Sequence, residues 1–449
     1  MRGYAHFITV AELVGLGWAL GLGLCTSLLF CLYLLHMLTT PLVFVAGGAS
    51  LLLTFLGLLA LSKGRSYETT FPGNSPFVAY AGLAVAAVQV AYTARTAWFA
   101  PLTGYDAWAM WSLKARMFAM GGPALSYFTH PAYSHPDYPL NLPLTESIAF
   151  RLPNALGIPL AAEIGPTCFA ALLLVFFGVL GRLYGPSIAG VSTALLALIP
   201  ALPFQSALGY ADVPLTMYIG AASVFFVAWR HTRSSLDALI FGLCLGGALW
   251  TKKEGTLFAV LMLALLTFTL VRPVVQGLGG RLRTIGVVVA ATLAIPLPWL
   301  IFSALTHFQG GDFLPLTSAT LESNISRLPT IALFFYSDMM RLVDFSLFWP
   351  LLFVAVVVAL PRLSATGILL LALLVLIISL DAGTYIFSVW NPYTVHLANS
   401  SNRLLLQTTP LAVLVLVEAA LAWSRPWTRR GRRNGQSVID IGSTKTHLI

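Results

Sequence analysis

Residues 363–380 read LSATGILLLALLVLIISL, a run of 18 residues without a charge between Arg362 and Asp381. A helix rises about 1.5 Å per residue, so a run of this length crosses most of a hydrocarbon core about 30 Å thick. Comparable runs recur along the 449 residues, which are 58% hydrophobic and only 9% charged. Soluble domains carry roughly 25% charged residues. The sequence therefore predicts an all-α polytopic membrane protein.

Twelve apolar segments, separated by Pro, Gly and charged residues, are predicted to cross the membrane. They are residues 12–36, 41–62, 76–97, 164–182, 186–204, 213–229, 235–250, 256–272, 284–304, 346–360, 365–380 and 404–423. Together they make one transmembrane domain, residues 1–427. The remaining basic tail, residues 428–449, is polar and predicted to be disordered.

The cations predict the orientation of the chain. Most Lys and Arg residues fall in alternate connections and in the tail, and the positive-inside rule makes that face and both termini cytoplasmic. The net charge of +9 then serves mainly to contact anionic membrane lipids. No basic stripe interleaved with aromatic residues indicates nucleic acid. Three longer outer loops, 98–163, 305–345 and 381–403, are expected to form a small extracytoplasmic cap of amphipathic helices.

The first outer loop begins GYDAWAMWSLKARMF, residues 104–118. If this stretch is helical, Asp106 lies near its start, where it could cap the helix while the tryptophans anchor the interface. Alternatively, Asp106 faces a cavity and deprotonates or orients an acceptor nucleophile, with Tyr105 and Trp108 beside it. Lys114 is expected to contact headgroups or the loop.

The same loop continues SHPDYPLNLPLTE, residues 134–146. Its three prolines predict an extended path that cannot be regular helix. This strip is either a structural Pro-rich loop or the lining of a cleft, with the polar residues His135, Asp137, Tyr138 and Glu146. His130 and His135 with Asp137 could bind a metal, although their spacing is weak evidence for one.

Polar residues also gather at the outer ends of three later spans. GYADVPL, residues 209–215, contains Asp212, which could cap the next helix or supply a second carboxylate or a cation ligand. WTKKEG, residues 250–255, contains Lys252, Lys253 and Glu254. HLANSSNRLLLQ, residues 396–407, contains His396 and Arg403. These outer cations could snorkel to headgroups or bind a lipid phosphate at the bilayer edge.

The order of these motifs resembles the membrane glycosyltransferases of the C superfamily (GT-C), in the branch of protein O-mannosyltransferases and lipid A aminoarabinose transferases. The resemblance covers residues 76–423. It rests on an Asp after an early span, the HPDYPLNLP strip, the YADVPL turn, the TKKEG turn and a late RLLL, each of which is short. Three departures stand beside it: Ala107 follows Asp106, HPDYP replaces Lys-Pro-Pro, and two extra spans precede the first loop.

The resemblance implies an enzyme of the bacterial cell envelope, in the inner or plasma membrane. It would move a sugar from a polyprenyl-phosphate donor to a glycan, lipid or protein acceptor on the extracytoplasmic face. Asp106 would act as base or acceptor-orienting carboxylate, and Lys252, Lys253 and Arg403 would hold the lipid phosphate. Asp212 and the 135–138 strip would shape the sugar or acceptor site. No cofactor is certain, and a divalent cation stays possible.

Two other classes of function stay open from the residues. A transporter or flippase of lipid-linked sugars would use the same cations to hold phosphate without chemistry. A glycan polymerase or ligase would use a similar outer cavity for a larger donor. Polar groups cluster on the outer side while the inner halves of the spans are nearly all apolar, which favours an enzyme with one-sided access. The chain contains no P-loop, GxSxG or HExxH motif.

Overall fold

A computed structural model describes residues 9–62, 75–123, 125–129, 135–271, 277–307 and 311–424. The described chain is helical and contains no strand, apart from one isolated bridge between Phe313 and Ser388. The predicted tail, residues 428–449, and His130 of the suggested metal site lie outside the described residues. The all-α prediction is confirmed.

The helices follow one another with short connections. The N-terminal part contains α1 (Val10–Leu34), α2 (Thr40–Ser62), α3 (Pro76–Phe99), η1 (Ala107–Trp111), α4 (Ser112–Ala119), α5 (Leu125–Thr129), α6 (Asn141–Ala149) and α7 (Asn154–Ala162). The middle contains α8 (Ile164–Tyr184), α9 (Pro186–Ala197), α10 (Ala201–Ala207), α11 (Asp212–Thr232), α12 (Ser235–Thr251), α13 (Lys253–Val271), α14 (Leu278–Ala294) and α15 (Leu297–Thr306). The last part contains α16 (Ser318–Asn324), η2 (Ile325–Arg327), α17 (Leu328–Met339), α18 (Leu342–Phe345), α19 (Phe348–Ala359), η3 (Leu360–Arg362), α20 (Ala365–Thr384), η4 (Tyr385–Phe387) and α21 (Tyr393–Ser424).

Eight of the described helices are long and apolar enough to cross a membrane. The number rises to ten if each of two bent pairs, α9 with α10 and α14 with α15, counts as one span. The bends of 59° and 67° fall beside Pro200 and Pro296, because proline lacks the N–H that continues a helix. The chain is therefore an all-α, multi-pass membrane protein. Two further predicted spans, 235–250 and 346–360, fall on shorter apolar helices.

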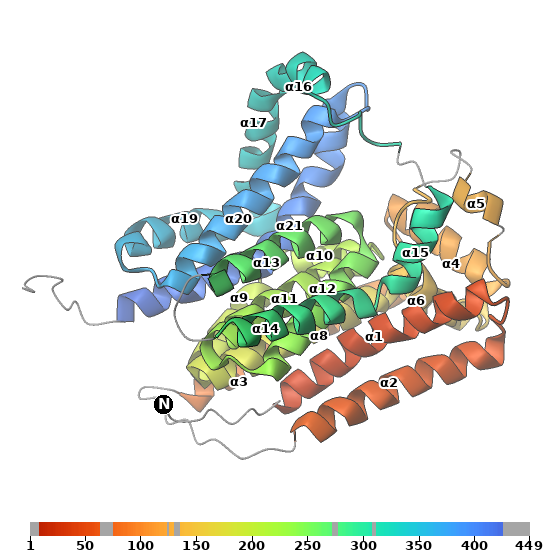
Figure 1. Cartoon of the computed structure of the whole chain (residues 1–449), viewed down its shortest axis with the longest axis horizontal. Helices are drawn as coiled ribbons and strands as arrows, with labels where there is room; N and C mark the ends of the chain where they lie inside the picture. The colour runs from red at the N-terminus through yellow and green to blue at the C-terminus, as the bar shows by residue number, and fades with distance from the viewer. Residues whose placement is uncertain are drawn as a thin grey trace, which may run out of the picture.

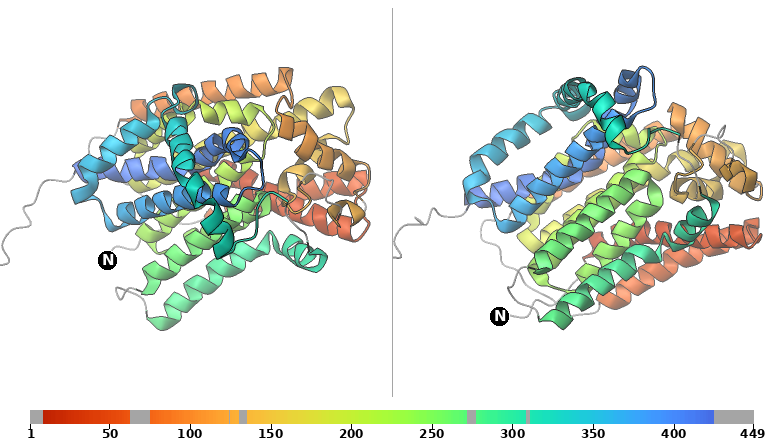
Figure 2. Two further views of the ribbon diagram at one scale, coloured as in Figure 1. Left: turned by 90° about the horizontal axis from the view of Figure 1, so that it is seen from above. Right: turned by 45° about the horizontal axis from the view of Figure 1, so that its top comes forward.

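The long helices lie side by side, and α4, α5 and α6 gather at one end of them (Figure 1). The start of α1 and the end of α21 lie at the opposite end. There the guanidinium of Arg182 on α8 pairs with Glu12 and with Asp237, each at 2.8 Å. The hydroxyl of Tyr184, also at the end of α8, donates to Glu418 on α21. Figure 2 shows the same arrangement from two further directions.

Helix α11 occupies the centre of the bundle, and its residues 212–229 are all buried. The first outer loop is fastened to this bundle through α6. The side-chain amide of Asn141 donates to Thr251 on α12, and its oxygen accepts from Thr26 on α1. The indole of Trp250 also donates to Thr26. These buried bonds hold the first outer loop against the ends of α1 and α12.

Three expectations about local structure are wrong, and the structure decides between two alternatives for Lys114. Pro143 lies inside α6, since the first turn of a helix needs no N–H from that residue. Lys114 is fully buried and donates to the carbonyl of His135, so of the two contacts expected for it the loop contact is confirmed. Trp111 is buried in the core and anchors no interface, whereas Trp108 is exposed. Residues 393–403, expected to be loop, form the first turns of α21.

Candidate functional site

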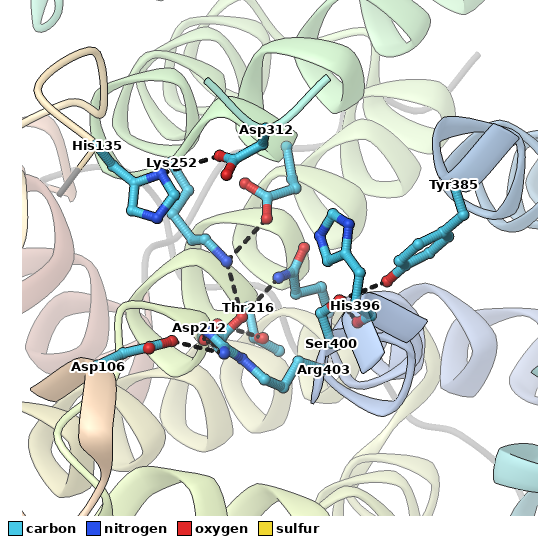
Figure 3. Close-up of polar contacts among 12 residues, drawn as sticks. Asp106, His135, Asp212, Thr216, Lys252, Asp312, Tyr385, His396, Ser400 and Arg403 are labelled. Carbon is cyan, nitrogen blue, oxygen red and sulfur yellow. Dashed lines mark hydrogen bonds and ion pairs between the residues drawn. The ribbon is translucent and has the colours of Figure 1, made fainter. Parts of the chain in front are cut away.

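A cavity of about 790 Å³ opens at the end of the bundle where the first outer loop lies. It is lined by ten of the twelve predicted site residues: Tyr105, Asp106, His135, Tyr138, Asp212, Lys252, Lys253, Glu254, His396 and Arg403. The other two, Trp108 and Asp137, are not part of its lining. The charged residues point toward one another from several different helices (Figure 3). The structure thus brings together residues that are separated by nearly 300 positions in the sequence.

Asp212, at the first position of α11, is the centre of the charged network. One carboxylate oxygen accepts from Arg403, at 3.0 Å from Nε and 2.8 Å from Nη2. The other accepts from Nζ of Lys252 at 3.0 Å and from the amide of Gln407 at 2.8 Å. Asp212 is fully buried, and its side chain makes no helix-capping bond. Its geometry is that of an anchor for two cations, and a carboxylate so fully engaged is poorly placed to accept a further proton.

Arg403 joins this buried anchor to the open cavity. Its Nη1 donates to Asp106 at 2.7 Å, and its guanidinium lies over the ring of Tyr210 at 4.6 Å from the centroid. The Asp106 side chain is 31% exposed, against 13% for Arg403. The side chain of Asp106 makes no capping hydrogen bond at the start of η1, so Asp106 does not have the helix-capping role considered for it. Its carboxylate points instead toward Arg403, at a place that solvent can reach.

Lys252 lies in the turn between α12 and α13 and is buried between two carboxylates. Its Nζ is 3.0 Å from Asp212 and 2.8 Å from Glu254. Burial lowers the pKa of Lys252, but the charges of Asp212 and Glu254 outweigh it and leave the pKa raised above its ordinary value. The ammonium is therefore charged at neutral pH. Because Lys252 and Arg403 are buried in ion pairs, they do not snorkel to headgroups.

The first outer loop forms a second cluster at the cavity. Nδ1 of His135 is 2.9 Å from Asp312. Lys253 pairs with Asp137 and lies 5.3 Å above the ring of Tyr138. Burial raises the pKa of Asp312, but the bond and charge of His135 and the charge of Lys253 outweigh it and lower the pKa overall. These contacts link the 135–138 strip, α13 and the segment before α16.

An aromatic group from the last third of the chain lies against the same cavity. His396 and Trp390 stack with centroids 5.0 Å apart, and Nδ1 of His396 is 2.8 Å from the hydroxyl of Ser388. The hydroxyls of Tyr385 and Ser400 are 2.7 Å apart. Ser401, by contrast, points away and donates to Asp338. The first turns of α21 therefore present His396, Ser400 and Arg403 to the cavity.

Several polar residues of this region were not predicted as site residues, among them Asp312, Asp381 and Gln407. Asp381 could have been predicted from the sequence, because its charge directly follows the apolar run 363–380. Gln407, four residues after Arg403, lies on the same face of α21. Asp312 could not have been predicted, because its partner His135 is distant in the sequence. Glu146, named with the 134–146 strip, is buried away from the cavity and accepts from Ser112 at 2.7 Å.

No group of three or more His, Cys, Asp and Glu residues in the described ranges could hold a metal ion. His135 and Asp137, suggested as metal ligands, pair instead with Asp312 and Lys253. No family model, curated protein or solved structure matches the chain. The cavity and its charged residues are thus the basis for proposing a function.

Proposed function

We propose that the protein is a membrane glycosyltransferase with a GT-C-like architecture. It moves a sugar from a polyprenyl-phosphate donor to an extracytoplasmic glycan, lipid or protein acceptor. In this proposal the chain has twelve spans, both termini are cytoplasmic, and the cavity opens at the outer membrane surface. The observation that supports it best is the 790 Å³ cavity, which joins a solvent-accessible carboxylate to two buried, anchored cations.

The cations suit a phosphate leaving group. When the acceptor oxygen forms its bond to the anomeric carbon, the bond from that carbon to the phosphate oxygen breaks and negative charge grows on the phosphate. Arg403 and Lys252 are held in place by Asp212, so they need no rearrangement to stabilise that charge. Stabilisation by preorganised charges is usually the largest single contribution to catalysis.

Asp106 suits the role of proton acceptor. It is the most exposed carboxylate of the Asp212–Arg403 network, and it sits beside the cation that would contact the phosphate. A hydroxyl bound in the cavity could donate its proton to Asp106 as it attacks. The aromatic group around His396 and Trp390 offers a flat surface for a sugar ring, as apolar and aromatic linings do in most ligand pockets.

The substitution Asp106→Asn tests this role. It keeps the size of the side chain and an oxygen facing Arg403, but it removes the basic group. We expect transfer from a synthetic polyprenyl-phosphate sugar to fall by on the order of 10²–10⁴-fold, the usual contribution of a general base. Asp344→Asn is the control, because Asp344 also pairs with an arginine but lies outside the cavity. Transfer by Asp106→Asn at the rate of the control would remove Asp106 from the mechanism.

A further inference from the structure

A second, much smaller cavity adjoins the first. Its volume of about 10 Å³ has room for one species of the size of a water molecule. Four of its lining residues carry side-chain oxygens: Glu254, Asp381, Gln407 and Thr408. The rest of the lining is apolar and comes from α11, α13, α20 and α21. Glu254 and Asp381 line both cavities, so these two carboxylates stand between the small cavity and the large one.

The two carboxylates lack the partners that buried charges normally have. Asp381 is 6% exposed, and its carboxylate accepts no hydrogen bond and forms no ion pair with any described residue. Glu254 bonds Lys252 through Oε1, while its Oε2 is buried and has no partner among the described residues. Burying a carboxylate without a partner is costly, so such groups pair with a cation or bind one.

Two neutral oxygens complete the set. Gln407 uses its amide N–H to bind Asp212, which leaves its carbonyl oxygen available. Thr408 donates its hydroxyl proton to the carbonyl of Leu405, which leaves the lone pairs of its oxygen available. Carboxylate, amide and hydroxyl oxygens around a space for one small species are the ligands that hard cations prefer.

The charges around the two cavities point to a divalent ion. Four carboxylates share the region with only two cations of their own network: Asp106, Asp212, Glu254 and Asp381 against Lys252 and Arg403. Of the other charged lining residues, Lys253 pairs with Asp137 outside the lining, and His135 pairs with Asp312. A divalent cation bound between Glu254 and Asp381 would stabilise both carboxylates in their ionised form.

We propose that Glu254, Asp381, Gln407 and Thr408 bind one divalent cation of the hard, oxygen-coordinated class, such as Mg²⁺ or Mn²⁺, with water from the large cavity as further ligand. Binding itself is independent of the proposed function. Its consequence for catalysis rests on that function: the ion would offset the negative charge of these carboxylates and let a phosphate approach Lys252 and Arg403.

The test titrates Mn²⁺ into the purified full chain after chelator treatment and follows the free ion by electron paramagnetic resonance. We expect one Mn²⁺ to bind per chain in the wild type and in Asp344→Asn. Asp381→Asn and Glu254→Gln should each weaken binding by more than about tenfold, the lower end of what even outer-shell changes cost. Mg²⁺ should compete with Mn²⁺ for the site.

Thermal unfolding supplies a second readout. Adding Mg²⁺ should raise the melting temperature of the wild type and leave that of Asp381→Asn unchanged, because an ion stabilises only the folded state that binds it. Absence of Mn²⁺ binding in the wild type, or wild-type affinity in both variants, would overturn the site. Asp106→Asn should keep the ion, so lost transfer with intact Mn²⁺ binding separates the two proposals.

Discussion

Asp212 determines how the charged residues of the cavity are placed. Its four hydrogen bonds hold Arg403, Lys252 and Gln407 from two different parts of the chain. Removing one member of such a buried network leaves the others uncompensated, which typically costs about 3–5 kcal/mol. Asp212 therefore contributes to the site through the positions of its partners, while Asp106 alone of the network's aspartates is open to a substrate.

Glu146 predicts a pH dependence of stability. Burial raises the pKa of its carboxyl group to about 8, against the opposing effects of Ser112 and Arg116. A raised folded-state pKa means that the stabilising contribution is complete below the unfolded value of 4.5 and is lost as the pH rises through about 8. At this group the free energy of unfolding should fall by about 1.4 kcal/mol per pH unit within that window.

Glu146→Gln should remove this slope, since the amide stays neutral and can still accept from Ser112. Melting temperatures between pH 5 and 8 measure the effect, with Glu322→Gln on the exposed face of α16 as the control. If Glu146→Gln keeps the slope of the wild type and of the control, the carboxyl group is already ionised in the folded protein at neutral pH.

At the residue scale, the sequence was sufficient to predict those site residues that are charged and lie directly beside an apolar span. Asp106, Lys252 and Arg403 stand out because a charge beside a long apolar run needs a reason. Which carboxylate would bind which cation was not predictable, because the partners of Arg403 lie 191 and 297 positions away. The pairing of His135 with Asp312 depends in the same way on how the outer segments fold together.

At the scale of elements, the turn between α12 and α13 places three ionic residues at the cavity: Lys252, Lys253 and Glu254. It can do so because Gly255 approaches α12 closely: a Cβ at Gly255 would lie 2.0 Å from the carbonyl oxygen of Ala248. That distance is far below van der Waals contact. Any side chain at Gly255 would push α13 away from α12 and displace Lys252 and Glu254 from Asp212 and the small cavity.

Gly255→Ala should therefore destabilise the protein by about 1–3 kcal/mol, the usual cost of overpacking. Gly286→Ala is the matched control, because a Cβ at Gly286 within α14 would meet no atom within 4 Å. That change should be neutral or slightly stabilising, as alanine favours helix over glycine. Equal melting temperatures for the two variants would show that α13 can move away from α12 at Gly255 without loss of stability.

The boundaries of elements were predicted less well than their existence. Long apolar runs such as 363–380 form helices as expected. The two bent pairs were predicted as single spans, and their bends were not, because a proline near the end of an apolar run can either lie in a first turn or break the helix. Residues 393–403 were expected to be loop because they are polar. Their polarity is explained by the cavity that α21 lines, and not by exposure to solvent.

At the scale of the whole molecule, the bundle has two different ends. One end is closed by ion pairs, with Arg182 between Glu12 and Asp237. The other end contains the 790 Å³ cavity, and every charged residue that lines it was assigned to the outer face from the positive-inside pattern. Access from one end is what an enzyme on an extracytoplasmic substrate requires, whereas a flippase must open to both.

The most direct measurement reconstitutes the wild-type protein in liposomes with a synthetic polyprenyl-phosphate sugar and a hydroxyl acceptor, and then analyses both products by mass spectrometry. For a glycosyltransferase we expect a new glycosidic bond on the acceptor and an equal amount of released polyprenyl phosphate. We also expect Asp106→Asn to form neither product at an appreciable rate. Movement of intact donor between the two leaflets, with no new glycoside, would contradict the account and identify a flippase.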